Sequence, residues 1–86
     1  MASDCVVLVV DDEQMIEEMI EGHLMRSGYE HSSFGDPQKA LAFFRKNHKD
    51  IGLAIIDLTV PGMSGDQLAK QLCKIAPALP VILMTG

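Results

Sequence analysis

The sequence predicts an open α/β fold built on a parallel sheet, and two features of its 86 residues carry this prediction. Three runs, at residues 5–10, 51–56 and 81–84, are continuously apolar, which is typical of strands covered on both faces. Segments with apolar residues at helical spacing separate the strand-like runs. This alternation of strand and helix, with no linker or repeat, predicts a single domain with right-handed crossovers.

The first helix is expected directly after the first apolar run. Its apolar stripe comprises Met15, Ile16, Met19, Ile20 and Leu24. Gly28 suits the left-handed position past a helix end, so this helix should stop near Ser27. Residues 29–34 (YEHSSF) form a more polar strand, which we expect at an edge of the sheet.

Two further helices are predicted from their end signals. Asp36 is a good cap for the first N–H groups of a helix, and Pro37 fits the first turn. The other helix follows a loop at residues 58–65 and ends before Pro77. Their short apolar stripes consist of Ala40, Leu41 and Phe44, and of Leu68, Leu72 and Ile75.

Composition excludes several classes of partner. Seven lysines and arginines against twelve acidic residues give a formal net charge of −5, which argues against nucleic-acid contact and against anionic membrane surfaces. No apolar run approaches the roughly 20 residues of a membrane span. Cys5 and Cys73 stand apart in apolar runs, so we expect buried thiols in a reducing, cytoplasmic compartment.

Acidic residues close two of the apolar strands at their carboxyl ends. Asp11 and Asp12 follow the first strand, Asp57 follows the third, and Thr85 holds the same place after the fourth. If the first and third strands are neighbours, the three carboxylates converge and repel one another. A hard divalent cation removes that repulsion, and carboxylate oxygens with retained water suit Mg²⁺.

Each of these residues also has a purely structural interpretation. An Asp pair after a strand is often a helix cap, Asp57 alone is compatible with a solvated loop, and Thr is common at strand ends. Their joint placement at the carboxyl ends of separate strands favours a site. The other candidates are interpreted as structural: His23, His31 and His48 lack ligand spacing, and Met15 and Met19 belong to the core stripe.

Three segments, VLVVDDE, AIIDLTVPGMSG and VILMTG, resemble the signature segments of the response-regulator receiver domain of two-component signalling. The resemblance implies a flavodoxin-like sheet of order 2-1-3-4-5 and a phosphoacceptor that assists its own modification rather than an ordinary enzyme. It implies Asp57 as the phosphorylated residue, with a sensor histidine kinase as the donor. Asp12 and Asp57 would bind Mg²⁺ directly, Asp11 chiefly through water, and Thr59 through its backbone carbonyl. Thr85 matches the switch hydroxyl of the family.

The resemblance stops after the fourth strand. A complete receiver has five βα units, on the order of 120 residues, and includes a lysine after the fifth strand. Residues 1–86 are therefore expected to form a C-terminally incomplete domain of strand order 2-1-3-4, without the fifth βα unit. Its fourth strand would be an edge with bare apolar faces, which predicts a symmetric homodimer through residues 78–85.

Three functions stay open at this point. The first is a receiver that accepts phosphate on Asp57. The second is a degenerate receiver that acts as a dimerisation or interaction module without phosphotransfer. The third is a phosphatase of the haloacid-dehalogenase type, which also uses an aspartate at a strand end. That class needs a second Asp two residues later, and Thr59 occupies this position.

Overall fold

The computed structural model describes residues 6–12, 14–58 and 62–84, with side chains from residue 18 onward in the first helix. A four-stranded parallel sheet has the order β2-β1-β3-β4, which confirms the predicted fold class and strand order. The elements along the chain are β1 (Val6–Val10), α1 (Gln14–Arg26), β2 (Glu30–Phe34), α2 (Pro37–Asn47), the 3₁₀ turn η2 (His48–Asp50), β3 (Ile51–Asp57), α3 (Gly65–Ile75) and β4 (Val81–Met84).

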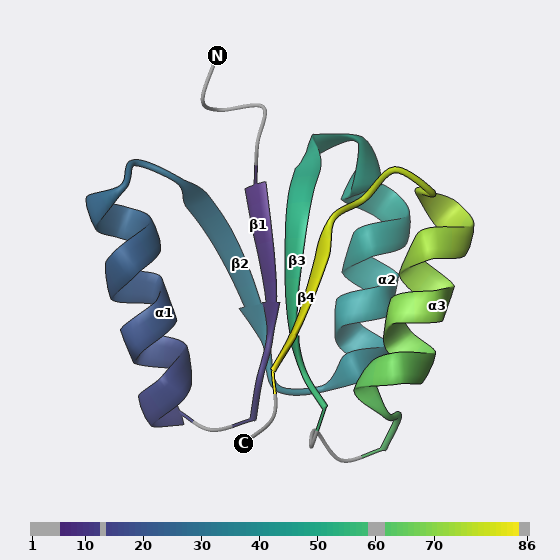
Figure 1. The fold of residues 1–86 in the computed structure, drawn as a ribbon, viewed down its shortest axis with the longest axis horizontal. Helices are drawn as coiled ribbons and strands as arrows, with labels where there is room; N and C mark the ends of the chain where they lie inside the picture. The colour runs from purple at the N-terminus through teal and green to yellow at the C-terminus, as the bar shows by residue number, and fades with distance from the viewer. Residues whose placement is uncertain (1–5, 13, 59–61, 85–86) are drawn as a thin grey trace.

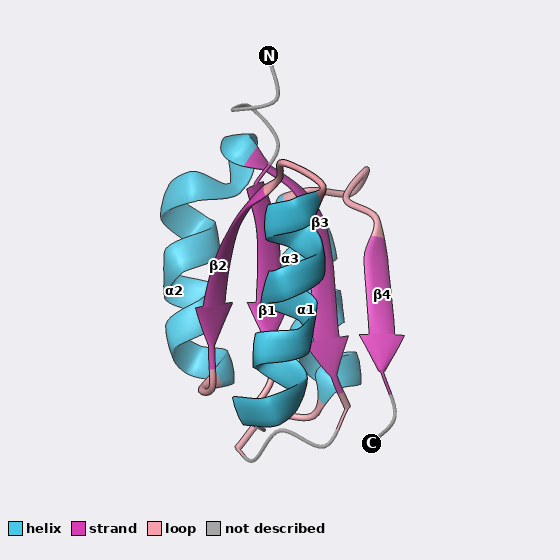
Figure 2. Ribbon diagram, turned by 90° about the vertical axis from the view of Figure 1, so that its left-hand side faces the viewer, coloured by secondary structure: helices cyan, strands magenta, loops and turns pink. Residues whose placement is uncertain are grey.

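The sheet lies between two unequal helical layers. Figure 1 shows α1 on one side of the sheet and α2 with α3 on the other. In Figure 2, α1 crosses in front of β1 and β3, whereas β4 stands clear of it. No helix in the described part of the chain is long and apolar enough to cross a membrane.

The main core fills the space between the sheet and the α2–α3 layer. From the sheet it takes Leu8, Val10, Ala54 and Ile56, which alternate with residues of the other face. The helices contribute Ala40, Leu41, Phe44, Leu68 and Leu72, as their predicted stripes require. Each fully buried side chain of this size contributes about 1.5–3 kcal/mol, so this layer is the principal source of stability.

Local signals place the ends of the helices where the sequence predicts them. The Asp36 side chain accepts a hydrogen bond from the Gln38 N–H at 2.9 Å, and Pro37 opens α2. Ser64 caps α3 in the same way, because its Oγ accepts from the Gln67 N–H at 3.2 Å. Gly28 has φ of 81°, the left-handed conformation expected past the end of α1.

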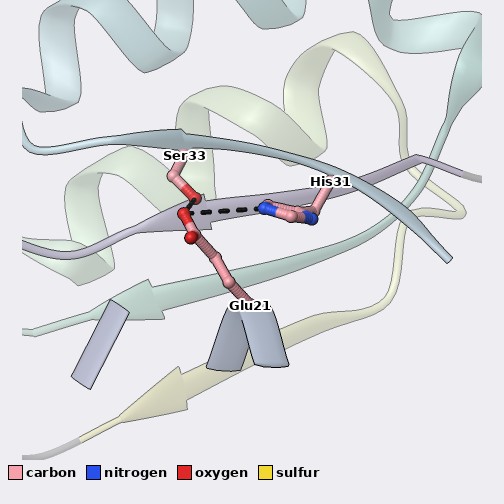
Figure 3. A network of polar contacts seen from close by, with 3 residues as sticks. All are labelled: Glu21, His31 and Ser33. Carbon is pink, nitrogen blue, oxygen red and sulfur yellow. Dashed lines mark hydrogen bonds and ion pairs between the residues drawn. The ribbon is translucent and has the colours of Figure 1, made fainter. Parts of the chain in front are cut away.

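A polar contact attaches α1 to β2, and Figure 3 shows its three side chains. Ser33 Oγ donates to Glu21 Oε1 at 3.1 Å, and His31 Nε2 lies 3.5 Å from the same oxygen. The predicted core role of Met19 is wrong, because its side chain is 60% exposed. Only one helix covers this side of the sheet, so nothing in the described chain packs over that part of α1.

The prediction that the fourth strand is an edge with bare apolar faces is confirmed. Within β4, Ile82 is 50% and Leu83 42% exposed, because this strand pairs only with β3 in the described sheet and α1 does not cover it. Cys73, in contrast, was predicted to be buried and is exposed. It follows Leu72 on α3, and one helical step of about 100° turns it away from the buried Leu68–Leu72 stripe.

Gly65 allows α3 to begin directly against the end of β3. A Cβ at this position would lie 2.8 Å from Leu58 Cδ2, 2.9 Å from Leu58 Cα and 3.2 Å from the Asp57 carbonyl oxygen. Backbone atoms cannot move aside cheaply. We therefore expect Gly65→Ala to lower the free energy of unfolding by about 2 kcal/mol or more, measured by urea denaturation.

Gly22→Ala is the matched control. A Cβ there meets only the end of the Arg26 side chain at 3.5 Å, an ordinary contact. Since Gly22 lies inside α1, the substitution should stabilise the chain by about 0.5–1 kcal/mol. Equal effects of the two substitutions would contradict a close approach at Gly65.

Candidate metal centre

The carboxyl ends of the strands form the edge that carries the acidic residues. Because β1 and β3 are adjacent and parallel, Val10 pairs with Ile56. One step further along the two strands come Asp11 and Asp57. The first and third strands are therefore neighbours, which is the condition under which the sequence predicts that the carboxylates converge. This edge lies at the bottom of the sheet in Figure 1.

Three carboxylates meet at this edge. One side-chain oxygen each of Asp11, Asp12 and Asp57 lies within 4.8 Å of the other two. Asp11 and Asp57 are almost fully buried, at 1% and 2% exposure, whereas Asp12 is exposed. The cluster thus has a buried floor and one solvent-facing wall, which gives an ion or a substrate access from water.

Hydrogen bonds from both flanking strands hold the backbone of this site. The Asp11 N–H donates to the Phe34 carbonyl at 3.0 Å, which extends the pairing of β1 with β2 beyond the last strand residue. Asp57 pairs with Met84, and the Leu58 N–H donates to the Met84 carbonyl at 2.9 Å. The backbone that carries the two buried aspartates is therefore held by β2 on one side and by β4 on the other.

Two glycines follow strands that end at this edge, and of these Gly35 did not stand out from the sequence. A Cβ at Gly35 would lie 3.8 Å from both the Asp11 carbonyl oxygen and Asp12 Cα, so this residue borders the acidic pair. Gly62 has φ of 102°, and a Cβ at this position would lie 3.9 Å from Pro37 Cγ at the start of α2. The signal for Gly35 was its place directly after β2, at the same edge as the aspartates.

The donor set fits Mg²⁺. Opposite oxygen ligands of an octahedral Mg²⁺ lie about 4.2 Å apart, and this ion commonly combines one or two carboxylates with retained water. A spread of at most 4.8 Å therefore suits an ion held by two of these carboxylates directly and by the third through water. Like charges this close oppose one another, and a cation cancels that repulsion.

The structure does not test the two remaining predicted site residues. Thr59 and Thr85 lie outside the described residues, so their predicted roles stay predictions. In the part of the chain that the structure describes, no histidine joins a group able to hold a metal ion. His31 instead contacts Glu21, which agrees with its structural interpretation.

A 2-1-3-4 parallel sheet with an acidic cluster at its carboxyl edge defines a doubly wound α/β domain with its site beside a topological switch point. The family model of the response regulator receiver domain matches residues 7–86. The chain belongs to this family, and the resemblance seen in its motifs is confirmed.

Individual relatives agree with this assignment. The sensory transduction protein RegX3 of Mycolicibacterium smegmatis is 38% identical over 80 residues, which are 93% of this chain and 34% of that protein. A receiver domain protein of Clostridium thermocellum superposes with a TM-score of 0.89 at 32% identity, over 95% of this chain and 65% of that one. A third match comes from the crystal structure of the histidine kinase ThkA in complex with the response regulator protein TrrA. The matched chain superposes with a TM-score of 0.82 at 33% identity, over 94% of this chain and 68% of that one. The chain thus spans about a third of the length of RegX3.

Mg²⁺ should stabilise the folded chain, because the cluster exists only when β1 and β3 are paired. At tenfold excess over Kd the gain is about 1.4 kcal/mol, which raises Tm by about 5–10 °C in thermal unfolding with and without EDTA. Asp57→Asn should abolish this shift. Without metal it should raise the stability of the chain by about 1 kcal/mol, because it removes one of three like charges.

Asp66→Asn is the control for this experiment. Asp66 is an exposed acid in the first turn of α3 and does not belong to the cluster. Its Mg²⁺-dependent shift in Tm should equal that of the unmodified chain. An unmodified chain whose melting curve ignores Mg²⁺ would show that the acidic cluster is not a metal centre.

Proposed function

We propose that this chain is a phosphoacceptor receiver, which takes a phosphoryl group onto Asp57 in a Mg²⁺-dependent reaction. The observation that carries the proposal is the convergence of Asp11, Asp12 and Asp57 within 4.8 Å, at the end of the central strands of a receiver-family domain. A buried, backbone-fixed carboxylate beside an exposed one provides a nucleophile and an open approach to it.

The donor in this proposal is a phosphohistidine on a sensor kinase. Support comes from the solved complex of the histidine kinase ThkA with TrrA, whose chain matches this one at 33% identity. In the transfer, an Asp57 side-chain oxygen forms the new O–P bond while the N–P bond of the donor breaks. The electron pair of the broken bond returns to the imidazole nitrogen, so no oxidant or reductant is required.

Catalysis of this step rests on charge stabilisation. Asp12 and Asp57 would bind Mg²⁺ directly, Asp11 through water, and Thr59 through its backbone carbonyl. The bound ion would neutralise the charge that develops on the phosphoryl oxygens during transfer. The N-terminal ends of α1 and α3 lie at the same edge and favour negative charge there. Thr85 is assigned the switch hydroxyl that follows the phosphoryl group.

The two other functions make different demands on the same residues. A haloacid-dehalogenase-type phosphatase would need an acid–base carboxylate at position 59, where this chain has threonine. Because threonine cannot act as the acid–base group that such a phosphatase uses to release its product, we favour an acceptor over a turnover enzyme. The reducing, cytoplasmic location inferred from the isolated cysteines stays a prediction.

Incubation with a small phosphodonor and Mg²⁺ tests the phosphoacceptor proposal. Intact-mass measurement should show the addition of one phosphoryl group, lost again under conditions that hydrolyse acyl phosphates. Asp57→Asn should abolish the modification, and Asp12→Asn should slow it by about tenfold or more through loss of a metal ligand.

Asp66→Asn again supplies the control and should be phosphorylated like the unmodified chain. Modification that persists in Asp57→Asn would refute the acceptor assignment. Sustained turnover of a generic phosphate ester would instead favour the phosphatase. A parent chain that gains no phosphoryl group, but whose Tm still rises with Mg²⁺, would favour the degenerate receiver.

The exposure of β4 favours a second role, self-association. Ile82 and Leu83 are exposed although both lie in a strand, and β4 is an edge of the described sheet. An edge strand offers unpaired N–H and C=O groups to another strand. A two-fold partner would pair this edge and cover the apolar face beside it in one interface, burying well over about 1,600 Å².

Analytical ultracentrifugation at micromolar concentration tests this second role. The unmodified chain should sediment as a dimer, and Ile82→Lys should yield unfolded chain by circular dichroism. Met25→Lys is the control, since Met25 is even more exposed but lies on α1, and it should leave the dimer intact. A folded monomer of the unmodified chain would disprove β4-mediated dimerisation.

A further inference from the structure

The amino edge of the sheet, at the top of Figure 1 and opposite to the acidic cluster, contains a hollow of about 120 Å³. Apolar side chains of Val6, Phe43 and Ile51 contribute to its lining, together with polar residues of β2, α2 and η2. Its volume equals about four water molecules of liquid, and drug-sized ligands occupy about 300 Å³ or more. The hollow therefore suits only the end of a side chain or a very small molecule.

The register of the sheet places an exposed acidic residue on each side of this hollow, Glu30 and Asp50. Val6 pairs with Glu30 on one side and with Ile51 on the other, and Asp50 directly precedes Ile51. Glu30 and Ile51 are two strand spacings apart, about 10 Å. Paired residues share a face of the sheet, so Glu30 lies on the same face as Val6, which packs against the core beneath α2 and α3.

The hollow also contains polar groups that can accept hydrogen bonds. Asn47 donates one Nδ2 hydrogen to the Phe43 carbonyl at 3.0 Å, and its side-chain oxygen can accept from a ligand. Asn47 is the last residue of α2, where the helix dipole is negative. Ser32 adds a hydroxyl from β2.

No lysine or arginine is among the described residues that line the hollow, although Arg45, Lys46 and Lys49 occur in the same stretch of chain. His31 does contribute to the lining, but its Nε2 lies 3.5 Å from Glu21 Oε1 of α1. The hollow is thus lined by apolar residues, one of them the aromatic Phe43, together with two exposed acidic residues and the last residue of α2.

We propose that this hollow binds the guanidinium end of an arginine side chain from a protein partner. A planar guanidinium stacks on an aromatic ring and donates in a fork to carboxylates, whereas an ammonium is a compact, strongly hydrated charge. Glu30 and Asp50 would repel the α-carboxylate of free arginine, which favours an arginine within a polypeptide. This site is independent of the acidic cluster and of its phosphorylation.

An NMR titration with n-propylguanidinium tests the site, and neutral n-propylurea is the matched control for charge. Amides of residues 30–32 and 47–51 should shift with a Kd of about 1–10 mM, as expected for so small a ligand. Glu30→Gln and Asp50→Asn should each weaken binding by about fivefold or more, whereas Asp66→Asn should not. Unchanged amide spectra elsewhere establish that the variants are folded.

A second comparison tests the source of the guanidinium. N-acetyl-arginine N-methylamide, which has no α-carboxylate, should bind more tightly than free arginine. Tighter binding of free arginine would overturn the assignment to a protein partner. Equal shifts with n-propylurea, or a Kd that neither substitution changes, would overturn the site itself.

Discussion

Parallel pairing of β1 with β3 is the constraint on which the other features of this domain depend. It aligns Val10 with Ile56 and therefore brings Asp11 and Asp57 together one residue beyond. The same pairing buries the apolar side chains of both strands under α2 and α3. Core and candidate site thus depend on the same strand pairing, and both are lost in a chain whose central strands are apart.

The acidic cluster lowers the stability of the fold at the place where a cation is expected to bind. Three carboxylates within 4.8 Å repel one another, and burial of Asp11 and Asp57 deprives two of them of water. The apolar core beneath, together with backbone bonds to Phe34 and Met84, holds the charges in place. Any cation that binds this edge therefore acts on the fold as well as on the site.

The two faces of the sheet are built differently. Beneath α2 and α3 the packing is apolar, with Phe44, Leu68 and Leu72 fully buried. Across the sheet, α1 approaches β2 through Glu21, Ser33 and His31, and β4 stays open. The carboxyl edge, the amino edge and the β4 edge are consequently three separate surfaces, with different charge and different suitable partners.

The sequence by itself determined the elements, their ends and the acidic residues, since local chemistry is enough for these. Asp36 and Gly28 act at their own positions, and apolar runs report strands directly. Tertiary structure decided the burial of individual residues: Met19 and Cys73 were expected to be buried but are exposed. Periodicity reports which side chains are apolar, whereas burial depends on whether another element packs over them. The hollow at the amino edge was likewise beyond the sequence, because only strand register sets Glu30 and Ile51 on either side of Val6.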